Sequence, residues 1–117
     1  MTIQRFDDNS TEFGLWLRAQ PEIDSDLGYR ATNIDYCWQY RHTGEWMFIE
    51  EKRYNAKPKF WQVIIFQMIT KLCMHDNLFK GFFYITFENT SPEDGKIYLN
   101  NEEITKEYLL NFLQFKT

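Results

Sequence analysis

Cysteine is scarce in this sequence, which has only Cys37 and Cys73 among its 117 residues. We interpret both as small buried hydrophobic residues in a reducing compartment, not as a disulfide framework. No group of Cys and His residues has the spacing of a zinc site. The sequence therefore argues against a disulfide scaffold and against a zinc module.

Long hydrophobic runs are also missing. Gln62, Gln67 and Lys71 interrupt the longest apolar stretch, so no run approaches the length of a membrane span. Residues 1–8 lack a signal-peptide core, and no glycine-rich loop is present that would cradle a phosphate. We expect a single domain over residues 1–117 that acts in the cytoplasm, without a membrane partner.

The sequence also lacks an excess of positive charge. Thirteen Lys and Arg residues face seventeen Asp and Glu residues, which gives a formal net charge of −4 at pH 7. A protein that binds nucleic acid through a broad basic surface is expected to be positively charged. Any binding of nucleic acid must therefore be local, through a small basic patch.

Hydrophobic residues are abundant, at 44%, and aromatic residues reach 19%, which rules out a disordered chain. Periodicity and proline positions predict an α/β fold, with a mixed central β-sheet flanked by helices in the order α-β-β-β-α-β-β-α. The acidic residues 22–29 read as a loop that leads into a short strand. We expect helices over residues 10–20, 59–77 and 105–115, and the main strands over 32–41, 46–53, 81–88 and 96–99.

The helix predicted over residues 59–77 has almost no polar face. A helix that is apolar nearly all round is buried on more than one side. We expect the sheet to cover one side and something else, such as a second subunit, to cover the other.

The segment 46–53 is the centre of the functional argument. Side chains alternate along a strand, so Glu50 and Lys52 share one face, while Glu51 and Arg53 share the other. A turn at residues 42–45 or 43–44 pairs this strand with the preceding one, in a register that places Asp35 opposite Lys52 and Cys37 opposite Glu50. Asp35, Glu50 and Lys52 would then converge within roughly 5–8 Å.

Each of these residues also has a plainer interpretation. Asp35 and Lys52 would form an ion pair on a solvated sheet rim, worth about 0–1 kcal/mol. Glu12 lies in the first turn of the predicted N-terminal helix, where a carboxylate favours the helix dipole. Gln62 is either a partly exposed polar residue or one directed at the site.

Asp35, then Glu50-x-Lys52 on the next strand, then a helix that carries Gln62, resemble the PD-(D/E)XK nuclease superfamily. More narrowly, residues 28–36 and 48–53 resemble small stand-alone phage-type and prokaryotic members. The resemblance covers Thr11 to Phe87 and implies a restriction-endonuclease-like core in a prokaryotic or phage-infected host cell. Ile34-Asp35 stands where the superfamily usually has Pro-Asp.

The resemblance implies a metal-dependent nuclease that hydrolyses phosphodiester bonds, with DNA as the expected substrate. Asp35, Glu50 and the backbone carbonyl of Glu51 offer hard oxygen ligands for Mg²⁺ or Mn²⁺. Lys52 would position the attacking water, and Gln62 would orient water or substrate. Glu12 would add a carboxylate. Three cations are expected to hold phosphates: Arg53, Lys57 and Lys59.

A second hypothesis is a catalytically silent protein with the nuclease fold. It would act as a protein-binding module, either as a subunit or as an inhibitor in a phage or defence complex. An open site would favour catalysis, whereas a site plugged by Trp38 or Trp46 would favour binding. A nuclease that cuts both strands would need a homodimer, and the apolar central helix or the aromatic strands could supply its interface.

Overall fold

The computed structural model describes residues 12–29 and 33–117, and the chain divides into two units, residues 1–32 and residues 33–117. In the first unit, α1 (Glu12–Ala19) ends before Pro21, as predicted. The predicted loop contains two short 3-10 turns, Pro21–Ile23 and Ser25–Leu27, and the second ends at Gly28 in a left-handed conformation. The first two residues of the predicted N-terminal helix, Ser10 and Thr11, and the start of the strand expected at Thr32 lie outside the described residues.

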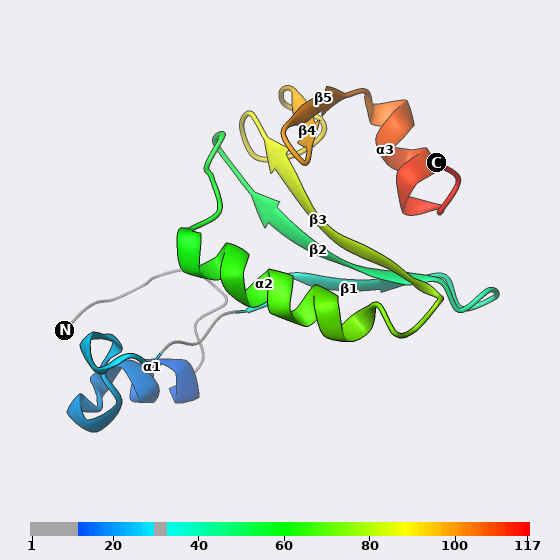
Figure 1. Ribbon diagram of the computed structural model, residues 1–117. Helices are drawn as coiled ribbons and strands as arrows, with labels where there is room; N and C mark the ends of the chain where they lie inside the picture. Colours follow the sequence, from blue (N-terminus) through cyan, green and yellow to red (C-terminus); the bar gives the residue numbers. More distant parts are fainter. Residues whose placement is uncertain (1–11, 30–32) are drawn as a thin grey trace. The chain divides into compact units, whose positions relative to one another are not determined.

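The second unit is built on a five-stranded mixed sheet (Figure 1). Its strands are β1 (Tyr36–Gln39), β2 (Trp46–Lys52), β3 (Phe79–Phe87), β4 (Ile97–Leu99) and β5 (Glu102–Ile104). They lie in the order β1-β2-β3-β4-β5, and only the β2–β3 pair is parallel. The parallel pair is connected through α2 (Phe60–Cys73), and α3 (Lys106–Leu113) closes the chain.

The α/β class with a mixed sheet and flanking helices is confirmed, but the order of elements differs from the prediction. Two strands precede α2 in the described residues and three follow it, because the chain turns at Asn100 and Asn101 and continues as β5. Both asparagines have positive φ values, 49° and 72°, which is typical of a tight hairpin turn. Part of the predicted third strand before α2 falls on residues 30–32, outside the described residues.

The predicted β1–β2 register is wrong by two residues. Cys37 pairs with Phe48 rather than with Glu50, and the same register continued by one residue beyond Tyr36–Ile49 places Asp35 opposite Glu50. The loop spans residues 41–44, because the Tyr40 amide donates to the Glu45 carbonyl at 3.0 Å. A shift of two residues keeps each side chain on its face. Asp35 therefore still shares a face with Glu50.

The two faces of the sheet bury different groups of side chains. The face toward α3 carries the main aliphatic and aromatic core, which comprises Met47, Ile49, Ile85, Phe87, Ile97, Leu109 and Phe112. The face toward α2 carries an aromatic layer, in which Phe66 stacks on Phe82 with ring centroids 4.1 Å apart. Because Glu50 and Lys52 follow Phe48 on this second face, they lie at the edge of the aromatic layer.

The helix α2 is shorter than predicted and is covered on one side only within the described residues. Phe66 is its one buried residue, at 2% exposure. Four residues spaced by one turn form a stripe of exposed apolar side chains, which we call the exposed stripe: Phe60, Ile64, Met68 and Leu72. The expected burial against the sheet is confirmed, and a covering partner for the exposed stripe stays a prediction.

Truncating Phe66 tests this packing. We expect Phe66→Ala to lower the free energy of unfolding by about 3–5 kcal/mol, because it empties a stacked and buried position. Phe60→Ala on the same helix is the control and should cost about 0.5 kcal/mol or less, because Phe60 is 80% exposed. Urea denaturation of both variants measures the difference. Equal losses would contradict the one-sided burial of α2.

Candidate functional site

Lys52 and Glu50 form an ion pair at the end of β2. The Lys52 Nζ lies 3.4 Å from the Glu50 Oε2, and their side chains are only 16% and 5% exposed. Lys52 also donates a hydrogen bond to the Gln62 Oε1 at 2.9 Å. The three side chains therefore form one connected group, in which the lysine is held between a carboxylate and an amide.

The start of α2 fixes the position of Gln62. Lys59 is the N-terminal cap residue, and its backbone N–H donates to the Gln62 Oε1 at 3.2 Å. This is the glutamine half of a capping box, in which the third residue of the helix reaches back to the cap. The same amide oxygen that caps α2 also orients the Lys52 ammonium.

Asp35 joins this group from the residue just before β1. Its Oδ2 accepts a hydrogen bond from the Glu51 backbone N–H at 2.8 Å, which holds the carboxylate against β2. The expected contact of Asp35 with Lys52 is replaced, because Lys52 pairs with the neighbouring Glu50 on its own strand. The Asp35 charge nevertheless acts on Glu50, as the pKa of Glu50 shows.

The Glu50 carboxyl is in an unfavourable environment for a charge. Burial, and to a smaller extent the negative charge of Asp35, raises the pKa of Glu50. The charge and the hydrogen bond of Lys52 lower this pKa, as does the backbone N–H of Asp35, but they do not offset the rise. The Glu50 Oε1 is buried and has no hydrogen-bond partner among the described residues. An unsatisfied buried polar atom costs about 1–3 kcal/mol. A cation beside Glu50 and Asp35 would neutralise this repulsion and give Oε1 a partner.

Tyr84 on β3 is a neighbour of the site that sequence reasoning missed. It pairs with Glu50 across the parallel β2–β3 ladder. Burial and the negative charge of Glu50 raise the pKa of Tyr84, so its phenol stays protonated. A βαβ connection predicted through the apolar helix would have identified this pairing, because it places the two strands side by side.

Glu51 and Arg53 lie on the face of the sheet opposite Glu50 and Lys52, as the alternation of side chains along the strand predicts. The Glu51 Oε1 accepts from the Tyr36 hydroxyl at 3.3 Å, and its Oε2 lies 2.8 Å from the Arg53 Nε. These contacts direct the Glu51 side chain away from Glu50, so only its backbone carbonyl fits the predicted ligand role. The Arg53 guanidinium is exposed but already holds a carboxylate.

The remaining residues predicted for the site lie further along the chain from the Glu50–Lys52 ion pair. Lys57 and Lys59 are exposed, just before α2, and the Lys59 Nζ lies 6.0 Å from the ring centroid of Trp61. Glu12 is exposed in the first turn of α1, where the helix dipole favours its charge. Glu12 belongs to the unit of residues 1–32, and its part in the site stays a prediction.

Trp38 and Trp46, whose presence in the site would favour the binding protein, both make hydrogen bonds elsewhere. The Trp38 Nε1 donates to the Leu113 carbonyl at 2.7 Å on the α3 face, and the Trp46 Nε1 donates to the Asp76 Oδ2 at 3.1 Å. Glu50 is nevertheless almost fully buried. The solvent-facing edge of the site is formed by Asp35 and the partly exposed Lys52.

The carboxylates of Asp35 and Glu50 are better suited to Mg²⁺ than to structural Zn²⁺. Among residues 12–29 and 33–117, no group of three or more His, Cys, Asp or Glu side chains is placed to hold a metal ion. Asp35 and Glu50 supply two carboxylates. Mg²⁺ is usually held by one or two carboxylates, with water and substrate phosphate completing its shell, whereas structural Zn²⁺ needs four protein ligands. In number and type of ligand, the two carboxylates are compatible with Mg²⁺ and insufficient for structural Zn²⁺.

Comparisons with protein-family models, with curated proteins and with solved structures give no match for this chain. Within the described part of the chain, no helix is long and apolar enough to cross a membrane.

Replacing Glu50 by Gln tests the electrostatics of the site. Because the pKa of Glu50 is raised in the folded state, its contribution to stability is complete at acidic pH and is lost as the pH rises through that pKa. We expect Glu50→Gln to match the wild type at acidic pH and to be more stable by about 1 kcal/mol at neutral pH. Urea denaturation across the pH range measures this. A less stable Gln variant at neutral pH would mean that the Lys52 ion pair outweighs the cost of burial.

Proposed function

We propose that this protein is a metal-dependent nuclease that hydrolyses phosphodiester bonds, with DNA as the expected substrate. The observation that supports this most strongly is the Glu50 carboxylate, which is buried, has one oxygen without a hydrogen-bond partner among the described residues, and adjoins both Asp35 and Lys52. A buried carboxylate oxygen that lacks a protein hydrogen-bond donor is a position where a cation would be stabilised.

Asp35 and Glu50 are the residues that would hold Mg²⁺ or Mn²⁺, together with the Glu51 carbonyl. The bound metal would polarise a phosphoryl oxygen and lower the pKa of a bound water. The chain's own part is to hold the two carboxylates together: the Glu51 amide fixes Asp35, and the packing of β2 between β1 and β3 fixes Glu50. Glu12 is proposed as an additional carboxylate.

Lys52 is proposed to position the attacking water and to stabilise negative charge on the phosphoryl group. Its ammonium has three N–H donors, and the contacts with Glu50 and Gln62 account for two. The third is directed by those two contacts and would serve the water or a phosphoryl oxygen. Gln62 is thus a positioning residue that acts through Lys52.

The arrangement of elements also supports the restriction-endonuclease-like fold. A hairpin, β1–β2, is followed by α2 and by a parallel strand, β3, as in the last part of the core implied by the sequence resemblance, although that core has three strands before the helix and the described residues have two. Lys57 and Lys59 lie between the end of β2 and α2, and we propose that they hold phosphates beside the site. Arg53 contributes to the same local patch through its exposed guanidinium. Binding through so few cations is consistent with a net charge of −4.

A catalytically silent binding protein is the second candidate, and the exposed stripe on α2 favours it. Phe60, Ile64, Met68 and Leu72 form an apolar row at 49% to 80% exposure. Contiguous exposed apolar surface is typical of protein–protein interfaces. In this candidate the stripe binds a protein partner or a second copy of the chain.

Cleavage assays separate the two candidates. We expect the wild type with Mg²⁺ or Mn²⁺ to cut at least one member of a panel of single-stranded, duplex, flapped and branched DNA and RNA substrates. Lys52→Ala and Glu50→Gln should lower the rate by about 100-fold or more, because each removes a charge from the reacting centre. Lys106→Ala is the matched control, because Lys106 pairs with the exposed Glu93.

The outcomes of this assay are distinct. Metal-dependent cleavage that both site variants lose, and that the control retains, supports the nuclease. Absence of cleavage by the folded wild type on the whole panel contradicts it and favours the binding protein. Equal cleavage by all variants would also contradict it, because the activity would then arise elsewhere.

A further inference from the structure

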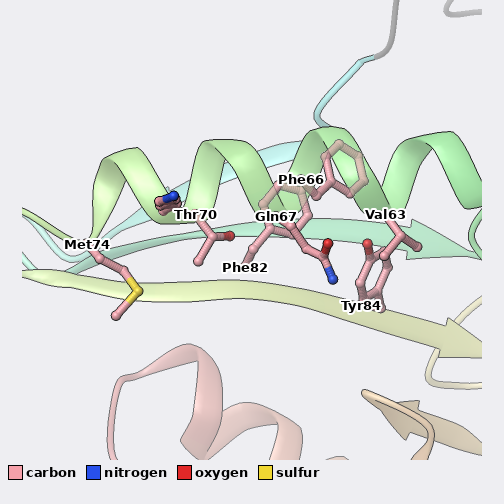
Figure 2. Close-up of a pocket in the computed structure, with 8 residues that line it drawn as sticks. Val63, Phe66, Gln67, Thr70, Met74, Phe82 and Tyr84 are labelled. Atoms are coloured by element: carbon pink, nitrogen blue, oxygen red, sulfur yellow. The ribbon is translucent and has the colours of Figure 1, made fainter.

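A hollow of about 350 Å³ lies between α2 and β3, beside the site already described (Figure 2). Side chains from one face of α2 form one wall of the hollow. Phe82 and Tyr84 of β3 form the opposite wall. The lining residues on the helix side are Val63, Phe66, Gln67, Thr70, Lys71 and the C-terminal cap residue Met74.

The polar residues of α2 are distributed in an unusual way. Within Phe60–Cys73 the polar residues are Gln62, Gln67, Thr70 and Lys71. Gln62 holds Lys52, and the other three all line the hollow. The outward stripe of the same helix is apolar, whereas a helix in water normally places its polar residues outward. Gln67 and Lys71 are exposed where the hollow opens to solvent, and Thr70 is partly buried, so the hollow combines aromatic rings with accessible hydrogen-bonding groups.

Tyr84 connects the hollow to the candidate site. Its ring lines the hollow, and its position on β3 pairs with Glu50 on β2. The Tyr84 ring also lies 6.0 Å from both Phe66 and Phe82, so the wall of the hollow is continuous with the aromatic layer. A ligand in the hollow would therefore lie next to the residues that hold the metal and the reacting phosphate.

We propose that this hollow binds an unpaired nucleobase of the substrate, an inference that rests on the nuclease function proposed above. A planar base finds aromatic rings on one side, and stacking of this kind tolerates any base. The Gln67 amide offers both donors and an acceptor to the edge of the base, and Thr70 adds a hydroxyl. The Lys71 ammonium at the lining suits a neighbouring phosphate.

A base in the hollow requires a substrate whose base is free to leave the duplex. A base inside a duplex is stacked and paired, so it enters a groove between a helix and a sheet only after leaving its stack. The preferred substrate is therefore single-stranded or locally unpaired nucleic acid, with one base in the hollow and an adjacent phosphodiester at Glu50 and Lys52. A continuous duplex is expected to bind more weakly.

Binding measured without cleavage tests this proposal. The probe is a short single-stranded DNA with one fluorescent adenine analogue, titrated with the Lys52→Ala protein so that no cutting occurs. Adding Gln67→Leu and Thr70→Val to that protein keeps the side-chain volumes and removes the hydrogen bonds. We expect this to weaken binding about 5- to 30-fold, since two hydrogen bonds contribute about 1 kcal/mol each. Met68→Leu on the exposed stripe is the matched control and should leave binding unchanged.

The result that would overturn the proposal is equal binding by the hollow variants and the control, or an affinity for a matched duplex that equals the affinity for the single strand. These outcomes are independent of the nuclease proposal. A wild type that cuts DNA while the hollow variants bind normally contradicts only the base pocket. A protein that binds the analogue through Gln67 and Thr70 but never cuts contradicts only the nuclease.

Discussion

The buried Glu50 carboxylate is the constraint on which the rest of the site depends. Its charge is removed from water, repelled by Asp35 and only partly offset by Lys52, and one oxygen has no partner in the described structure. Such a group is unfavourable for stability, and the packing of both sheet faces must compensate for it. A residue that weakens the fold in this way is characteristic of a functional site, where strain and perturbed pKa values concentrate.

The β2–α2–β3 unit brings the contributing groups together. The end of β2 supplies Glu50 and Lys52, the first turn of α2 supplies Gln62, and β3 supplies Tyr84. Gln62 has two functions at once, because one oxygen caps the helix and orients the lysine. The proposed chemistry and the stability of α2 are therefore coupled, and the hollow beside Tyr84 extends the same unit toward an unpaired base.

Much of this could be predicted from the sequence, and the failures have physical reasons. Strand alternation correctly placed Glu50 and Lys52 on one face, because a register shift of two residues leaves each side chain on the same face of the sheet. The register itself was wrong, because the turn was placed at residues 42–45 or 43–44, whereas the four-residue loop lies at residues 41–44, and a loop displaced by one residue shifts the pairing by two. Tyr84 was missed because no strand order was predicted for the sheet, and only the βαβ connection through α2 indicates that β2 and β3 are parallel neighbours. The burial of Glu50 was missed because it depends on where α2 lies over the sheet.

The most direct measurement of the central claim is a calorimetric titration of the folded protein with Mn²⁺ at several pH values. We expect saturable binding by the wild type that Asp35→Asn and Glu50→Gln abolish. Binding should release protons at mildly acidic pH, because the metal needs the ionised form of a carboxyl whose pKa is raised. Identical titrations for the wild type and both variants, or no binding by the wild type, would contradict a metal site at Asp35 and Glu50.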